Sequence, residues 1–110
     1  MCLTFNNYQK IALKTANYGS ENKIIYPALG LCGESGEVAE KIKKTIRDKG
    51  GKFTTEISLE IAKELGDVLW YITSLGNDLG FSLEEIANLN NEKTLSRKNR
   101  NVISGSGDNR

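Results

Sequence analysis

The most regular hydrophobic pattern in the chain is an apolar stripe between residues 57 and 79. Its members recur at steps of three or four residues: Ile57, Ile61, Leu65, Val68, Ile72, Leu75 and Leu79. This spacing places them on one face of an α-helix, as in a helix that packs within a bundle. Gly80 follows the stripe and predicts the end of this helix, because glycine readily adopts the left-handed conformation of a helix C-terminus.

Three further helices are predicted around this one. Helical spacing of apolar residues indicates a first helix over residues 4–18. A second begins near Pro27, which suits a first helical turn, and ends at Lys49 before two glycines. Ser82 followed three residues later by a glutamate is typical of a capping box, so a fourth helix is predicted from there to about residue 97.

The predicted fold is therefore all-α, with a four-helix bundle-type protomer. Residues 1–98 are expected to form one helical domain, and residues 99–110 a C-terminal tail that belongs to the same domain. A chain of 110 residues buries only a modest core. The long apolar stripe needs more cover than three short helices give, so association into an oligomer is expected.

Composition narrows the class of protein. Hydrophobic residues make up 38% and charged residues 26%, as in soluble globular proteins, and no apolar run is long enough to span a membrane. The N-terminus lacks the basic start and apolar stretch of a signal peptide. The two cysteines, Cys2 and Cys32, fit reduced thiols in a cytoplasmic protein. The net charge of +1 gives no support to a nucleic-acid or membrane partner.

The chemistry must come from groups other than histidine, because the chain has none. Two pairs of carboxylates stand out, each with three-residue spacing that places both members on one helix face: Glu34 with Glu37, and Glu64 with Asp67. If the second and third helices pack antiparallel, the pairs face each other, and four converging carboxylates repel unless a cation lies between them. Mg²⁺ prefers such oxygen ligands, and Mn²⁺ is a possible substitute.

Glycines surround both pairs of carboxylates. Gly33 and Gly36 bracket the first glutamate, and Gly66 lies inside the second pair. Each helical glycine costs about 1 kcal/mol relative to alanine, so three of them indicate that another backbone approaches closely. Tight helix packing explains the glycines equally well, and glutamates at this spacing on a helix also often form a merely solvated face.

Two segments resemble the signatures of MazG-like nucleotide pyrophosphohydrolases. The first is the run GLCGESGEVAE at residues 30–40, followed by the paired lysines 43 and 44, and the second is ELGDVLWY at residues 64–71. Both halves of the family pattern, E-x-x-E followed by E-x-x-D, are intact. The segment around Asn91 and Lys93, with Arg97, resembles the N-E-K…R segment of the family's last helix, and the ending GSGDNR is similar to the tail of small phage and bacterial members.

The resemblance implies hydrolysis of a nucleoside triphosphate, or its deoxy form, between the α- and β-phosphates by a helical dimer or tetramer. It implies that the four carboxylates at positions 34, 37, 64 and 67 are the metal ligands, and that Lys93 and Arg97 touch phosphate or nucleotide. Among the lysines that end the second helix, Lys44 matches the family's paired lysines. Carboxylate 34 or 37 is expected to act as the general base, and the sequence does not choose between them.

Other nucleotide contacts are predicted less directly. Gln9 and Asn17 on the first helix are candidates for the nucleotide pocket, as is Asn91 on the last. In the tail, Ile103 is expected to dock in an apolar groove and the glycines to bend the chain. Arg110 would then reach a phosphate or a carboxylate, because its planar guanidinium suits bidentate contacts.

An alternative hypothesis assigns the same residues a function without catalysis. A helical interaction module that binds a basic partner through its acidic face also fits the carboxylate pairs. The two hypotheses differ in a measurable way, because a binding module needs no Mg²⁺ and releases no pyrophosphate.

Overall fold

The computed structural model describes residues 2–101 and 103–108, and within them the fold is all-α, as predicted. The elements in chain order are α1 (Phe5–Leu13), a short 3₁₀ helix η1 (Ser20–Asn22), α2 (Ile25–Lys49), α3 (Thr55–Asp78) and α4 (Leu83–Asn99).

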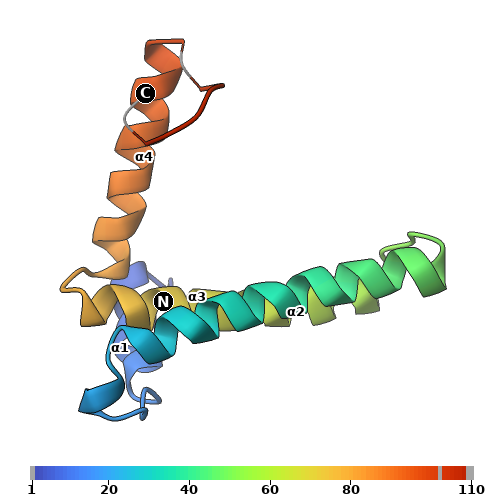
Figure 1. The fold of residues 1–110 in the computed structure, drawn as a ribbon, viewed down its shortest axis with the longest axis horizontal. Coiled ribbons are helices and arrows are strands. Elements are labelled where there is room, and N and C mark those ends of the chain that lie inside the picture. Colours follow the sequence, from blue (N-terminus) through green and yellow to red (C-terminus); the bar gives the residue numbers. More distant parts are fainter. Residues whose placement is uncertain (1, 102, 109–110) are drawn as a thin grey trace.

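The two long helices, α2 and α3, lie side by side along most of their length and form the longest arm of the molecule (Figure 1). The turn between them uses Gly50 and Gly51, both with positive φ, and Thr54 caps α3 by accepting a hydrogen bond from the amide of Ile57 at 3.2 Å. Because so short a connection reverses the chain, the two helices are antiparallel. The carboxylate pairs are therefore carried on neighbouring helices.

The other helices join this pair at one end. α1 packs against α3 and α4, and α4 then leaves the α2–α3 pair as a second arm (Figure 1). The predicted capping box at the start of α4 is confirmed, with the Ser82 hydroxyl and the Glu85 side chain each bonded to the other's backbone. The Gln9 side chain of α1 accepts a further hydrogen bond from the amide of Leu83 at 2.7 Å, which fixes α1 to the start of α4.

The first helix is shorter than predicted and ends at Leu13 instead of residue 18. In a continued α-helix the carbonyl of Ala12 would accept from the amide of Ala16. Here that carbonyl accepts from the amide and the hydroxyl of Thr15, at 3.1 and 2.8 Å, and from the indole of Trp70 at 3.1 Å. The hydrogen bond from Trp70 of α3 therefore helps to end α1. The spacing of apolar residues within α1 cannot predict this contact.

The start of α2 is fixed by Asp78 at the end of α3. Its carboxylate accepts hydrogen bonds from the amide of Ile24 at 2.9 Å and from the hydroxyl of Tyr18 at 2.7 Å. Ile24 has a φ of 69°, which is unfavourable for a β-branched residue. The Asp78 contact holds this strained residue and sets where α2 begins along α3.

The four helices do not close around a shared core in the single chain, so the predicted bundle-type protomer is not seen there. Among the described residues only Ala12 and Leu83 are buried hydrophobic residues, and Leu65 and Leu79 of the apolar stripe are each 52% exposed. The radius of gyration is 16.7 Å, against about 13 Å for a compact chain of this length. The physical reason lies in α4, whose residues 88–99 include only two apolar side chains and cannot cover the stripe.

Candidate metal and nucleotide site

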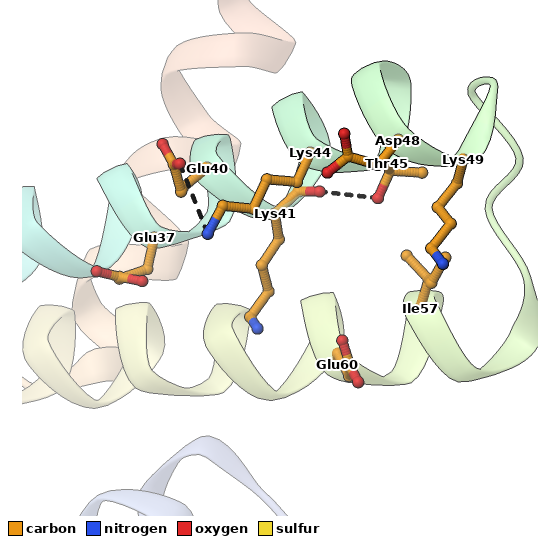
Figure 2. A pocket seen from close by; sticks show the side chains of 9 residues that line it. All are labelled: Glu37, Glu40, Lys41, Lys44, Thr45, Asp48, Lys49, Ile57 and Glu60. Carbon is orange, nitrogen blue, oxygen red and sulfur yellow. Dashed lines mark hydrogen bonds and ion pairs between the residues drawn. The ribbon is translucent and has the colours of Figure 1, made fainter.

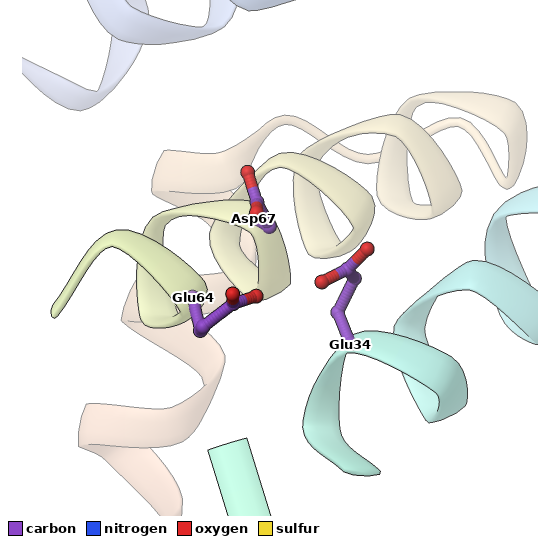
Figure 3. Close-up of side chains that lie close together, drawn as sticks. All are labelled: Glu34, Glu64 and Asp67. Carbon is purple, nitrogen blue, oxygen red and sulfur yellow. The ribbon is translucent and has the colours of Figure 1, made fainter. Parts of the chain in front are cut away.

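Three of the four predicted carboxylates converge between α2 and α3. Glu34 projects from α2, and Glu64 and Asp67 project from successive turns of α3 (Figure 3). One ligand oxygen from each of the three lies within 4.8 Å of the others. Glu34 and Glu64 are half-buried, and Asp67 is exposed. The antiparallel packing and the three-residue spacing on α3 produce the facing acidic groups that the sequence predicts.

The electrostatics of this acidic cluster favour a positive occupant. The pKa of Glu34 is raised above its ordinary value, first by burial, then by a hydrogen bond shared with Glu64, and then by the charges of its acidic neighbours. A cation relieves the same repulsion without protonation. Three carboxylates that supply only oxygen donors and lie open to solvent on one side fit the ligand preference of Mg²⁺ or Mn²⁺.

Glu37 lies outside this cluster. It is exposed, one helical turn further along α2, and it lines an adjacent cleft of about 230 Å³ between α2 and the first half of α3 (Figure 2). Its charge still contributes to the raised pKa of Glu34. Glu37 as a metal ligand stays a prediction.

Lys41 contacts the acidic cluster, although the sequence pattern does not predict this contact. Its ammonium nitrogen lies 3.9 Å from Oε1 of Glu64. Spacing along α2 alone suggests Glu37, four residues earlier, as the partner of Lys41. A signal for the observed contact does exist, because Lys41 follows Glu34 by seven residues and so lies two turns along the same face of α2.

Aromatic side chains form a wall beside the cluster. Trp70 and Tyr71 line a second hollow together with Glu34 and Asp67. The Trp70 indole donates to the hydroxyl of Thr15 at 2.8 Å, and the two aromatic rings meet edge to face with centroids 4.9 Å apart. Both rings are half-buried, so they combine a packing role with a surface that faces the carboxylates.

The glycines near the carboxylates do not serve the purpose predicted for them. A Cβ added at Gly33, Gly36 or Gly66 would meet nothing within 4 Å, so the predicted close backbone approach is wrong within the single chain. The close approach occurs at Gly30, where an added Cβ would collide with the ring of Tyr71. The aromatic wall therefore depends on a glycine one turn before Glu34.

The predicted nucleotide contacts on α1 and α2 are dispersed. Lys44 lines the cleft beside Glu37, with its ammonium 3.8 Å from Glu40. Gln9 is bonded to the start of α4, so its side-chain oxygen has a structural partner. Asn17 lines a separate hollow beside η1. None of the three is brought to the acidic cluster by the single chain.

The predicted contacts on α4 lie on the second arm. Asn91 is exposed, and the tail folds back onto Lys93 and Arg97. The carboxylate of Asp108 lies 3.2 Å from the ammonium of Lys93, and Arg97 donates to the backbone carbonyl of Asp108 at 2.9 Å. Hydrogen bonds to these two cations lower the pKa of Asp108. Arg97 is only 8% exposed, and its Nε has no hydrogen-bond partner among the described residues.

The tail therefore bends as predicted but docks differently. Gly105 and Gly107 have φ values of 127° and 83°, which glycine tolerates, and they return the chain towards α4. Ile103, predicted to dock in an apolar groove, is 57% exposed in the single chain. Arg110 lies outside the described residues, so its predicted contact stays a prediction.

Comparison with known proteins identifies the family of this chain. Residues 27–102 match the model of the MazG nucleotide pyrophosphohydrolase domain, and this chain belongs to that family. The chain is also similar to the gene 37 protein of Mycobacterium phage L5, with 45% identity over 109 residues that cover 94% of this chain and 96% of that protein. No solved structure matches the chain. In the part of the chain that the structure describes, no helix is both long and apolar enough to cross a membrane.

Proposed function

We propose that this protein is a Mg²⁺-dependent pyrophosphohydrolase that converts a nucleoside or deoxynucleoside triphosphate to the monophosphate and pyrophosphate. The observation that carries the proposal is the convergence of Glu34, Glu64 and Asp67 in a chain that belongs to the MazG family. The absence of histidine supports a mechanism that relies on carboxylates and a metal ion.

In this proposal the three clustered carboxylates hold the metal ion, which when bound neutralises phosphate charge. Glu37 completes the ligand set or accepts a proton from the attacking water, with Glu34 as the other candidate for that base. The position of Glu37, one turn from the cluster and exposed, favours it as the base. Lys44 in the adjacent cleft is proposed to contact the phosphates.

The proposed active enzyme is a homo-oligomer, a dimer or tetramer, in which the second arm serves another copy. The predicted contacts Lys93, Arg97 and Asn91 belong to α4, and this helix leads away from the α2–α3 pair that carries the acidic cluster (Figure 1). The exposed leucines of the α3 stripe supply an apolar surface for such an association. A monomer at micromolar concentration with full activity, measured by light scattering and turnover on one sample, would contradict this part of the proposal.

The activity is tested with a panel of nucleoside and deoxynucleoside triphosphates, with Mg²⁺ and with excess chelator. The decisive comparison is between Glu64→Gln, which removes a cluster charge, and Glu56→Gln, which removes a charge from the first turn of the same helix. Pyrophosphate release that requires Mg²⁺, is lost in Glu64→Gln and persists in Glu56→Gln supports the proposal. A folded protein that hydrolyses no member of the panel would instead favour the non-catalytic interaction module.

A further inference from the structure

Lys41 is the only cation within ion-pairing distance of the acidic cluster in the described part of the chain. Its side chain runs from α2 towards α3 and borders the cleft that Lys44 and Lys49 also line (Figure 2). The other nearby lysines of α2 are engaged elsewhere, since Lys43 lies 2.9 Å from Glu40 and Lys44 contacts the same carboxylate. Lys41 therefore lies between the carboxylates of the acidic cluster and the cleft.

The contact of Lys41 with the cluster is loose. The separation from Glu64 is 3.9 Å, longer than a hydrogen-bonded ion pair, and the Lys41 side chain is 34% exposed. One ammonium offsets only part of the charge of three carboxylates. A long flexible lysine held by one distant charge moves at little cost when a stronger cation arrives.

We propose that Lys41 is a mobile counter-ion that neutralises the acidic cluster before metal binding and contacts substrate phosphate afterwards. If the carboxylates held a divalent cation, the Lys41 ammonium would be repelled and would leave Glu64. The cleft that Lys41 also lines includes Glu37 and Glu60, each one helical turn from a member of the acidic cluster, so it would be within reach of the phosphates of a nucleotide held at the cluster. This inference rests on the proposed function, because it needs a metal ion in the cluster and a phosphate chain beside it.

The proposal predicts two opposite effects of one substitution on ligand binding. Lys41→Met removes a competitor of the metal ion, so the affinity for a divalent cation without nucleotide rises, by about three- to tenfold at low salt. The same change removes a phosphate contact, so the KM for the nucleotide at saturating Mg²⁺ rises by a comparable factor. Replacing a residue that merely supports the fold would not strengthen the binding of one ligand while weakening the binding of the other.

The test measures Mn²⁺ binding to the nucleotide-free protein by electron paramagnetic resonance and calorimetry, and the KM at saturating Mg²⁺. Lys43→Met is the matched control, because it also removes one charge and one ion pair from α2 but leaves the cluster untouched. Lys41→Arg keeps the charge and is expected to retain wild-type Mn²⁺ affinity.

Tighter Mn²⁺ binding and a raised KM in Lys41→Met alone support the inference. If the wild type binds Mn²⁺ and releases pyrophosphate but Lys41→Met matches Lys43→Met in both constants, the counter-ion role is overturned and the proposed function stands. If the wild type releases pyrophosphate but the nucleotide-free protein binds no Mn²⁺, the counter-ion role is overturned and the proposed function stands. If the wild type releases no pyrophosphate, the proposed function fails, and the inference fails with it.

Discussion

Replacing Gly30 by alanine tests the link between the packing of α2 on α3 and the candidate site. Alanine favours a helix by about 1 kcal/mol over glycine. At Gly30, however, the new methyl group would collide with the ring of Tyr71, and inserting a methyl into a packed contact costs about 1–3 kcal/mol. The two effects leave Gly30→Ala between neutral and about 2 kcal/mol less stable, with the Tyr71 ring displaced from the hollow beside Glu34 and Asp67.

Gly36→Ala provides the contrast on the same helix. Nothing lies within 4 Å of a Cβ at that position, so the helix-propensity gain of about 1 kcal/mol remains unopposed. Urea unfolding at one fixed protein concentration gives both free energies, and near-ultraviolet circular dichroism reports the environment of the aromatic wall. A Gly30→Ala protein that is as stable as Gly36→Ala, with an unchanged aromatic spectrum, would refute the packing argument.

Three further outcomes are expected. Asp67→Asn abolishes turnover yet raises the thermal stability of the metal-free protein, because it removes one of three mutually repelling carboxylates; unchanged turnover would exclude this residue as a ligand. Burial and the hydrogen bond to Asp78 raise the pKa of Tyr18 to about 12. The stabilisation that this pKa shift represents is therefore complete below pH 10, and it is lost between about pH 10 and 12. In Tyr18→Phe, the free energy of unfolding should no longer fall through this step as the pH rises. Deleting residues 104–110 should raise the KM or lower kcat without unfolding the helices, because Asp108 then no longer holds Lys93 and Arg97 in position. Identical constants would show that the tail has no part in the site.

Local periodicity and capping predict the helices well. The stripe from Ile57 to Leu79, the capping box at Ser82 and the glycines after Lys49 each reflect interactions within a few residues, and α2, α3 and α4 follow them. The early end of α1 is different, because it depends on the Trp70 indole, 58 residues away in the sequence. Spacing along one helix carries no information of that kind.

In the candidate site, too, some features follow from local spacing and others depend on contacts between helices. Three-residue spacing and antiparallel helices are enough to bring Glu34, Glu64 and Asp67 together. The position of Glu37 outside the cluster and the contact of Lys41 with Glu64 depend on the rotation of α2 relative to α3, which packing decides. The division into a helical domain and a tail stays a prediction.

The product of hydrolysis tests the central claim most directly. Phosphorus nuclear magnetic resonance of a triphosphate incubated with the protein and Mg²⁺ separates monophosphate and pyrophosphate from diphosphate and orthophosphate. Attack between the α- and β-phosphates yields one pyrophosphate for each monophosphate from the first spectrum onwards, and excess chelator stops the reaction. Diphosphate with orthophosphate as the first products, or the same rate in chelator, would contradict the assignment of the acidic cluster as the metal centre of a pyrophosphohydrolase.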